Sequence, residues 1–418
     1  MSMDPHAQRT VPDDRTGPVW LMDRYQSRAL IVGALFTILL IIGAFLGPNS
    51  SDHFFRAYLA GYVMWTGASL GCMALLMVQH LSAGKWGLII RRPLEAGAAQ
   101  FPLMFLLFIP IIFGMKHLFP WIQGGSLWNA QNSDAHTIML HKAHLMMNVP
   151  FFLVRWVLYF VIWWAFSTTL RRWSLQRDRD PLGRDWQRIF ENVSGIGVVV
   201  YSLTMTFAII DWVMSLDPTW YSTIFGLIYL AGQGLTAFSI CIITVLLLSQ
   251  EEPMRTMLRK TEMHDIGKLL FAFVMLYAYL SFSQWLIIWS GNLPDEIQFY
   301  LHRMAGNWVN LSRFLILFEF AVPFALLLSR RLKKQPAFMV PLCALILFVR
   351  IVDMYWHIEP SFRTQEREIT FNWMYLAAPL AIGGFWVFFY IRSLKSRPVF
   401  PAYDAQMEEI LEPEHATA

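Results

Sequence analysis

Three residues of one apolar stretch combine a guanidinium, a carboxylate and an imidazole. Arg350, Asp353 and His357 are spaced i, i+3 and i+7, so in a helix they lie on one face. Histidine titrates near neutral pH, and beside these two groups it could accept and pass a proton. Glu319 lies in the middle of the preceding apolar stretch, where a carboxylate is costly unless it is protonated or hydrated. These four residues indicate either a site of proton transfer or a satisfied structural network.

The sequence around these residues occurs twice in the chain. In both copies a histidine-x-methionine sequence precedes an arginine, and the number of residues between them is the same. An aspartate likewise precedes an acidic residue and a proline at a spacing that is the same in the two copies. Tyr58-Leu59-Ala60-Gly61 matches Tyr229-Leu230-Ala231-Gly232. His144-x-Met146 followed by Arg155-Trp156 matches His302-x-Met304 followed by Arg313-Phe314. Asp211 followed by Asp217-Pro218 matches Asp353 followed by Glu359-Pro360. Together they indicate an internal duplication.

The duplication places an arginine and an aspartate at similar depths in each copy. From the helical rise, Arg155 and Asp211 would lie ~10 Å and ~8 Å below the outer ends of their helices. Arg313 and Asp353 have the same relative positions in the second copy. We therefore expect the buried ion pairs Arg155–Asp211 and Arg313–Asp353. Such pairs either fix the register of two helices or belong to a proton or quinol site.

Three polar groups occur in the second copy alone. Glu319, Arg350 and His357 align with Val161, Ala208 and Ser215. A pair that only holds two helices together needs no further carboxyl or imidazole. The asymmetry therefore favours a proton path in the second copy, entered from the outside at His357.

The composition indicates that lipid surrounds these helices. Of the 418 residues, 56% are hydrophobic and only 15% are charged, whereas a soluble domain carries about a quarter charged residues. The fold class is therefore an all-α polytopic membrane protein with about ten spans. We expect spans at 29–46, 57–80, 99–119, 148–168, 194–216, 224–249, 266–290, 304–329, 337–358 and 372–393. Spans two to five and six to nine would form two four-helix bundles in the same orientation, with one helix flanking each end.

Loop charges predict the orientation. Basic residues gather in alternate connections, for example at Arg171, Arg172, Arg330 and Arg331, and such connections favour the cytoplasm. Both termini are therefore expected inside. The predicted segments are a cytoplasmic N-terminal segment (1–28), the first span with its outer loop (29–56), the two bundles (57–223 and 224–362), the last span (363–397) and a cytoplasmic tail (398–418).

No cofactor ligand set is recognisable. Cys72, Cys241 and Cys343 lie far apart in apolar stretches, which argues against an iron–sulfur cluster or zinc site. No pair of histidines lies mid-span to ligate haem. His144, just before the fourth span, remains a candidate for a proton or quinone path. The modest net charge of +4 bears on orientation and does not indicate a nucleic-acid partner.

In addition to these features, the chain from about 29 to 400 resembles the NrfD/PsrC-like (polysulfide reductase NrfD) membrane subunits of quinone-linked oxidoreductases. Within that family it looks most similar to the ActF-type subunit of alternative complex III. The resemblance is carried by the segments 267–284 and Ile351-Val-Asp-Met-Tyr-Trp-His357, and by Gln79-His80-Leu81 with Trp86 and Arg91-Arg92.

This resemblance implies a function and a set of partners. It implies a non-haem subunit of a quinol:cytochrome c (or copper-protein) oxidoreductase in the bacterial cytoplasmic (inner) membrane, with menaquinone or its quinol as a candidate ligand. The implied partners are a NrfD-like sister subunit, an iron–sulfur protein, haem c subunits and other small membrane subunits, with haem and iron–sulfur clusters on those partners.

Two other classes of protein remain open. A secondary transporter would bind a solute at the midplane charges, and a purely structural anchor would use them for packing alone. The parallel repeat argues against the transporter, because many transporters have inverted repeats and paired broken helices. The family resemblance also leaves open whether this chain binds quinol, moves protons or mainly supports its partners.

Overall fold

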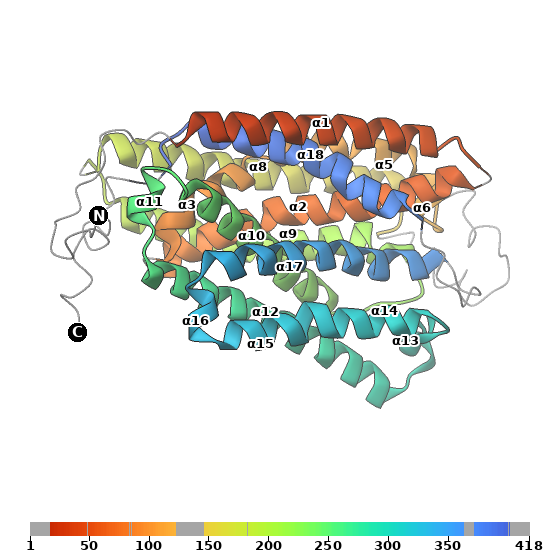
Figure 1. Cartoon of the computed structure of the whole chain (residues 1–418). Coiled ribbons are helices and arrows are strands. Elements are labelled where there is room, and N and C mark those ends of the chain that lie inside the picture. Colours follow the sequence, from red (N-terminus) through yellow and green to blue (C-terminus); the bar gives the residue numbers. More distant parts are fainter. Residues whose placement is uncertain are drawn as a thin grey trace.

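Ten helices of the computed structural model are long and apolar enough to cross a membrane, which confirms the expected fold class and number of spans (Figure 1). The structure describes residues 17–47, 49–82, 84, 86–122, 146–181, 183–362, 372–399 and 401. No β-strand occurs in these residues. The chain is therefore an all-α membrane protein.

The first half of the chain supplies the first five spans. Its helices are α1 (Val19–Gly43), α2 (Ser50–Ser82), α3 (Trp86–Ala98), α4 (Phe101–Leu107), α5 (Ile109–Phe113), α6 (Met115–Leu118), α8 (Val149–Arg179), α9 (Trp186–Trp212) and the 3₁₀ turn η1 (Met214–Leu216). The third span combines α3, α4 and α5.

The second half supplies the other five spans. Its helices are α10 (Phe225–Leu248), α11 (Met254–Met257), α12 (Lys260–Gly291), α13 (Pro294–Met304), α14 (Trp308–Leu315), the π-helix η2 (Ile316–Ala321), α15 (Val322–Leu328), α16 (Arg330–Lys333), α17 (Pro336–Ile358), the 3₁₀ turn η3 (Glu359–Phe362) and α18 (Met374–Lys395). The eighth span combines α14, η2 and α15.

We call the end of the molecule where α1 begins and α18 ends the inner face, on the left in Figure 1, and the opposite end the outer face. The charge pattern predicts that the inner face is cytoplasmic. The third span begins at Trp86 and not near residue 99 as expected. Arg91 and Arg92 were expected in the basic connection before this span, but both are buried in α3, together with Glu95.

The same order of neighbours occurs in the two halves. In the first, α2 packs on α3 and α9, and α8 packs on α3, α4 and α9. In the second, α10 packs on α12 and α17, while α14, η2 and α15 pack on α12 and α17. The helices that correspond in the duplicated sequence thus occupy corresponding places in two four-helix bundles.

The first helices of the two bundles, α2 and α10, pack against each other. Gly71 permits this contact, since a Cβ atom there would lie 2.2 Å from the backbone oxygen of Gln233. Gly67, one turn earlier, faces the side chain of the same residue. Small residues at i and i+4 let two membrane helices approach closely. Both flanking helices, α1 and α18, lie on the α2 side, with α18 packed on α2 and α1 on α18.

We predict that Gly71→Ala destabilises the contact between the two bundles by about 1–3 kcal/mol, because the new methyl group meets backbone and not a flexible side chain. Thermal unfolding of the purified protein in detergent measures the effect. Gly195→Ala in α9 is the control, since its Cβ atom would meet only Leu81, at 3.9 Å. Equal stability of the two variants would contradict the close α2–α10 contact.

Candidate functional site

The guanidinium of Arg350 binds two carboxylates inside the second bundle. Its Nη1 donates to Oε1 of Glu319 at 2.9 Å and to Oδ2 of Asp353 at 2.7 Å. Each of the three side chains is at most 6% exposed. Arg350 and Asp353 come from α17 and Glu319 from η2. One arginine therefore joins a mid-span carboxyl of the eighth span to the ninth span.

His357 extends this group toward the outer face. Its Nδ1 lies 3.0 Å from the backbone oxygen of Asp353 and 3.1 Å from Oδ1 of the same residue. Both of these oxygens can accept a hydrogen bond from Nδ1, which leaves Nε2 as the ring nitrogen not engaged with Asp353. The structure thus brings together Glu319, Arg350, Asp353 and His357, which we call the second-bundle cluster.

The helix of Glu319 is widened where this residue lies. Residues Ile316–Ala321 form a π-helical turn between α14 and α15. Pro323 follows four residues after Glu319 and has no N–H to donate to the carbonyl of Glu319, so the regular α-helical bond is lost there. Single π-helical turns within α-helices occur frequently at functional sites. Pro323 was visible in the sequence, but the widened turn was not predicted.

Residues of α10 and α12 line the second-bundle cluster. A Cβ atom on Gly232 would lie 2.3 Å from Nη2 of Arg350, so a glycine is needed to admit the guanidinium. The guanidinium lies over the ring of Tyr277, 4.9 Å from its centroid. The hydroxyl of Tyr229 and Nε of Arg350 are buried without a hydrogen-bond partner among the described residues. Buried polar groups are rarely left so, and these two atoms mark where water or a ligand would bind.

Arg303 closes the outer end of α17. It donates to the backbone oxygens of His357 at 2.6 Å and Trp356 at 3.1 Å, which caps carbonyl groups at the end of α17. It also donates to the backbone oxygen of Phe299 in its own helix, α13, at 2.9 Å. Burial lowers the pKa of Arg303 to about 10, while Asp217 opposes the shift, so this arginine stays charged at neutral pH. Its counterpart in the repeat is not an arginine, and no pattern in the sequence indicated this role.

The first bundle contains the ion pair that the duplication predicts. Arg155 donates from Nε to Oδ2 of Asp211 at 2.8 Å and from Nη2 to Oδ1 at 2.7 Å. Tyr159 also donates to Oδ2 of Asp211 at 2.8 Å. Ser215, which aligns with His357, donates to the backbone oxygen of Asp211 at 2.5 Å. The two aligned side chains therefore approach the same backbone atom in their respective bundles.

The predicted Arg313–Asp353 pair is wrong. Arg313 is exposed and donates to Oδ1 of Asn310 at 3.2 Å, whereas Asp353 pairs with Arg350 and His357. The depth of Arg313 along its helix was inferred from the rise, but the rise does not determine which way a side chain points around the helix. Arg350, one turn before Asp353 on the same helix, supplies the positive charge instead. His144 lies outside the described residues.

Aromatic rings fill the core of the first bundle where the second has its cluster. Phe108, Trp163 and Trp212 are fully buried, with the ring centroids of the two tryptophans 6.0 Å apart. Val161, which aligns with Glu319, is 53% exposed on the outside of α8. The first bundle thus retains the ion pair near its outer face above an apolar aromatic core.

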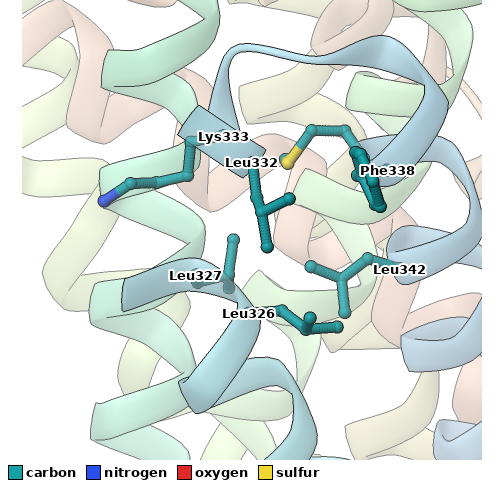
Figure 2. Close-up of a pocket in the computed structure, with 7 residues that line it drawn as sticks. Leu326, Leu327, Leu332, Lys333, Phe338 and Leu342 are labelled. Carbon is teal, nitrogen blue, oxygen red and sulfur yellow. The ribbon is translucent and has the colours of Figure 1, made fainter. Parts of the chain in front are cut away.

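A small apolar pocket lies at the inner end of the second bundle, away from the second-bundle cluster (Figure 2). Its walls are mainly leucines of α15 to α17, with Phe338 and Met339. The amine of Lys333 extends away from these leucines in Figure 2. The pocket therefore presents no polar group for chemistry.

Neither metal ligands nor known relatives identify the protein. Within the described residues, no three or more His, Cys, Asp or Glu side chains are grouped so that they could hold a metal ion. No protein-family model matches the chain, and no curated protein matches it either. The proposals below therefore rest on the geometry and on the residues themselves.

We predict that Asp211→Ala costs about 3–5 kcal/mol of stability, because it leaves the buried guanidinium of Arg155 without a carboxylate. The control is Arg155→Met combined with Asp211→Leu, which removes both charges and should cost much less. Thermal unfolding in detergent gives both values. If the double variant is as unstable as the single one, loss of packing and not the unpaired charge explains the effect.

Proposed function

We propose that this chain is a non-haem membrane subunit of a quinol-oxidising electron-transfer complex of the alternative complex III type, and that its second-bundle cluster exchanges a proton during turnover. The observation that carries the proposal is the buried Glu319–Arg350–Asp353 group in contact with His357. The resemblance to NrfD/PsrC-like subunits supplies the reaction class.

The charge balance of the cluster supports proton exchange. Two carboxylates share one guanidinium, so the fully ionised group with a neutral imidazole has a net charge of −1. A buried group avoids an uncompensated charge. One added proton, on Glu319 or on Nε2 of His357, makes the cluster neutral. A group whose neutral form holds one proton can take up and release that proton as its surroundings change.

The geometry also supports a direction for the path. Glu319 lies eleven residues from the outer start of α14, or ~16 Å along the axis, whereas His357 lies next to the outer end of α17. The unsatisfied hydroxyl of Tyr229 lies beside the cluster, and its ring is 5.3 Å from that of His357. A proton would pass between Glu319 and the outside by way of His357, with Arg303 and Trp356 covering the outer end.

The electrons would stay on partner subunits. We propose that a NrfD-like sister subunit, an iron–sulfur protein, haem c proteins and small membrane subunits carry or surround the redox centres, with menaquinol as the candidate substrate. The membrane would be the bacterial cytoplasmic membrane, with both termini inside. This chain would contribute the proton path and a surface for its partners.

A secondary transporter is the runner-up. Many transporters interrupt corresponding helices in the two halves of a repeat. Here the interrupted spans are the third and the eighth. In the repeat the third span corresponds to the seventh and the eighth to the fourth, so the two interrupted spans are not equivalent. The positions of the interruptions therefore favour the electron-transfer subunit over the transporter.

We predict that Glu319→Gln and His357→Ala each lower quinol-driven proton release in the reconstituted complex. Loss of a positioned proton-transfer group typically slows the dependent step about 10²–10⁴-fold. The measurements are the ratio of protons released to electrons transferred and the turnover rate. Ser215→Ala, at the aligned position of the first bundle, is the matched control and should leave both unchanged. Unchanged ratios and rates in fully assembled Glu319 and His357 variants would mean that the cluster is structural.

We also predict that the chain separated from its companions carries no haem. Its optical spectrum should lack a Soret band and its iron content should not exceed background, whereas the intact complex should show haem c. Stoichiometric haem on the separated chain would contradict the assignment of redox centres to the partners.

A further inference from the structure

A second group of buried charges lies at the inner end of the first bundle, on α3, α8 and the end of α18. Arg92 donates to Oε2 of Glu95 at 2.8 Å and also binds Asp178, while Ser174 donates to Oε1 of Glu95 at 2.5 Å. Arg397, just after α18, donates to Oε2 of Glu95 at 3.2 Å. Both carboxylates of the group are thus occupied by Arg92 and Arg397.

Arg171 of α8 lies in the same group without a carboxylate of its own. It donates to the neutral hydroxyl of Ser393 at 3.2 Å, and its backbone oxygen accepts from Nη1 of Arg397 at 3.3 Å. Its Nε is buried without a hydrogen-bond partner among the described residues. The side chain of Arg171 is only partly buried, and the bond to Ser393 uses one of its five N–H donors, so the accessible part of the guanidinium can bind an anion.

The positive charge at this place exceeds the negative charge. Three arginines (Arg92, Arg171 and Arg397) face the two carboxylates of Glu95 and Asp178. Arg172 and Arg392, the neighbours of Arg171 and Ser393 in the sequence, are exposed at the same end of the bundle. Burial and the neighbouring Arg92 lower the pKa of Arg397, against the opposing effect of Glu95. An anion would compensate this excess of positive charge.

We propose that Arg171, together with Arg397, Arg172 and Arg392, binds the phosphate group of an anionic phospholipid headgroup at the inner face. The residues lie near the inner ends of two spans, α8 and α18, and α1, whose apolar side chains are exposed, packs on α18. Basic pockets between membrane helices at the cytoplasmic side bind acidic headgroups. A lipid, which is confined to this surface, is the source of phosphate that the location favours.

The test is native mass spectrometry of the purified full chain, titrated with phosphatidylglycerol or with neutral phosphatidylcholine. Arg171→Gln should weaken phosphatidylglycerol binding about fivefold and leave phosphatidylcholine binding unchanged. Arg331→Gln, which removes an exposed arginine at the inner end of the second bundle, should bind both lipids as the wild type does. Equal phosphatidylglycerol affinity of the wild type and Arg171→Gln would overturn the proposal.

A second variant tests the proposal even if Arg171→Gln does not fold. Arg172→Gln with Arg392→Gln changes only exposed side chains and should lower phosphatidylglycerol affinity about tenfold or more; an unchanged affinity would overturn the proposal. Inorganic phosphate distinguishes the two sources of the anion. Millimolar phosphate should leave bound phosphatidylglycerol in place, and displacement by phosphate as efficient as by added lipid would overturn the lipid assignment.

Discussion

The sharing of one buried guanidinium by two carboxylates determines much of the second bundle. Arg350 cannot leave water at acceptable cost unless its charge is compensated, and in this bundle Glu319 and Asp353 provide that compensation. The space for it comes from Gly232 on the neighbouring helix, and the approach of Glu319 comes through the π-helical turn before Pro323. The π-helical turn, Gly232 and Pro323 therefore all contribute to placing two carboxylates around the buried guanidinium of Arg350.

Much of the fold follows from sequence because lipid imposes simple rules. Helix length and apolar composition predicted ten spans, and the rise per residue predicted that Arg155 and Asp211 meet. The same reasoning failed for Arg313, because its direction around the helix depends on the packing of neighbouring helices. It also missed the inner part of the third span, since Arg92 and Glu95, which pair with each other within α3, have their other partners, Ser174, Asp178 and Arg397, far away in sequence.

The two bundles show how a duplicated unit diverges without losing its packing. The corresponding helices keep the same neighbours, and Ser215 and His357 approach the same backbone oxygen in the two copies. What changes is the interior: aromatic rings fill the first bundle, while ionisable groups lie within the second. Because the contacts between helices are the same in both bundles, the side chains inside each bundle can differ, and they form an aromatic core in the first and the second-bundle cluster in the second.

This divergence has a consequence for ion movement. In the first bundle the Arg155–Asp211 pair lies near the outer face and the Arg92–Glu95 group near the inner face, with the stacked and edge-on aromatic rings between them. Among the described residues, that layer contains neutral polar groups such as Thr204, which accepts from Trp163, and Tyr201, which donates to Gln233. In the second bundle, by contrast, the carboxyl group of Glu319 lies near mid-span, where it binds Arg350. Under the proposed function, proton exchange would therefore belong to the second bundle, whereas the first bundle holds α2 against α10 and packs on the flanking helix α18 through α2.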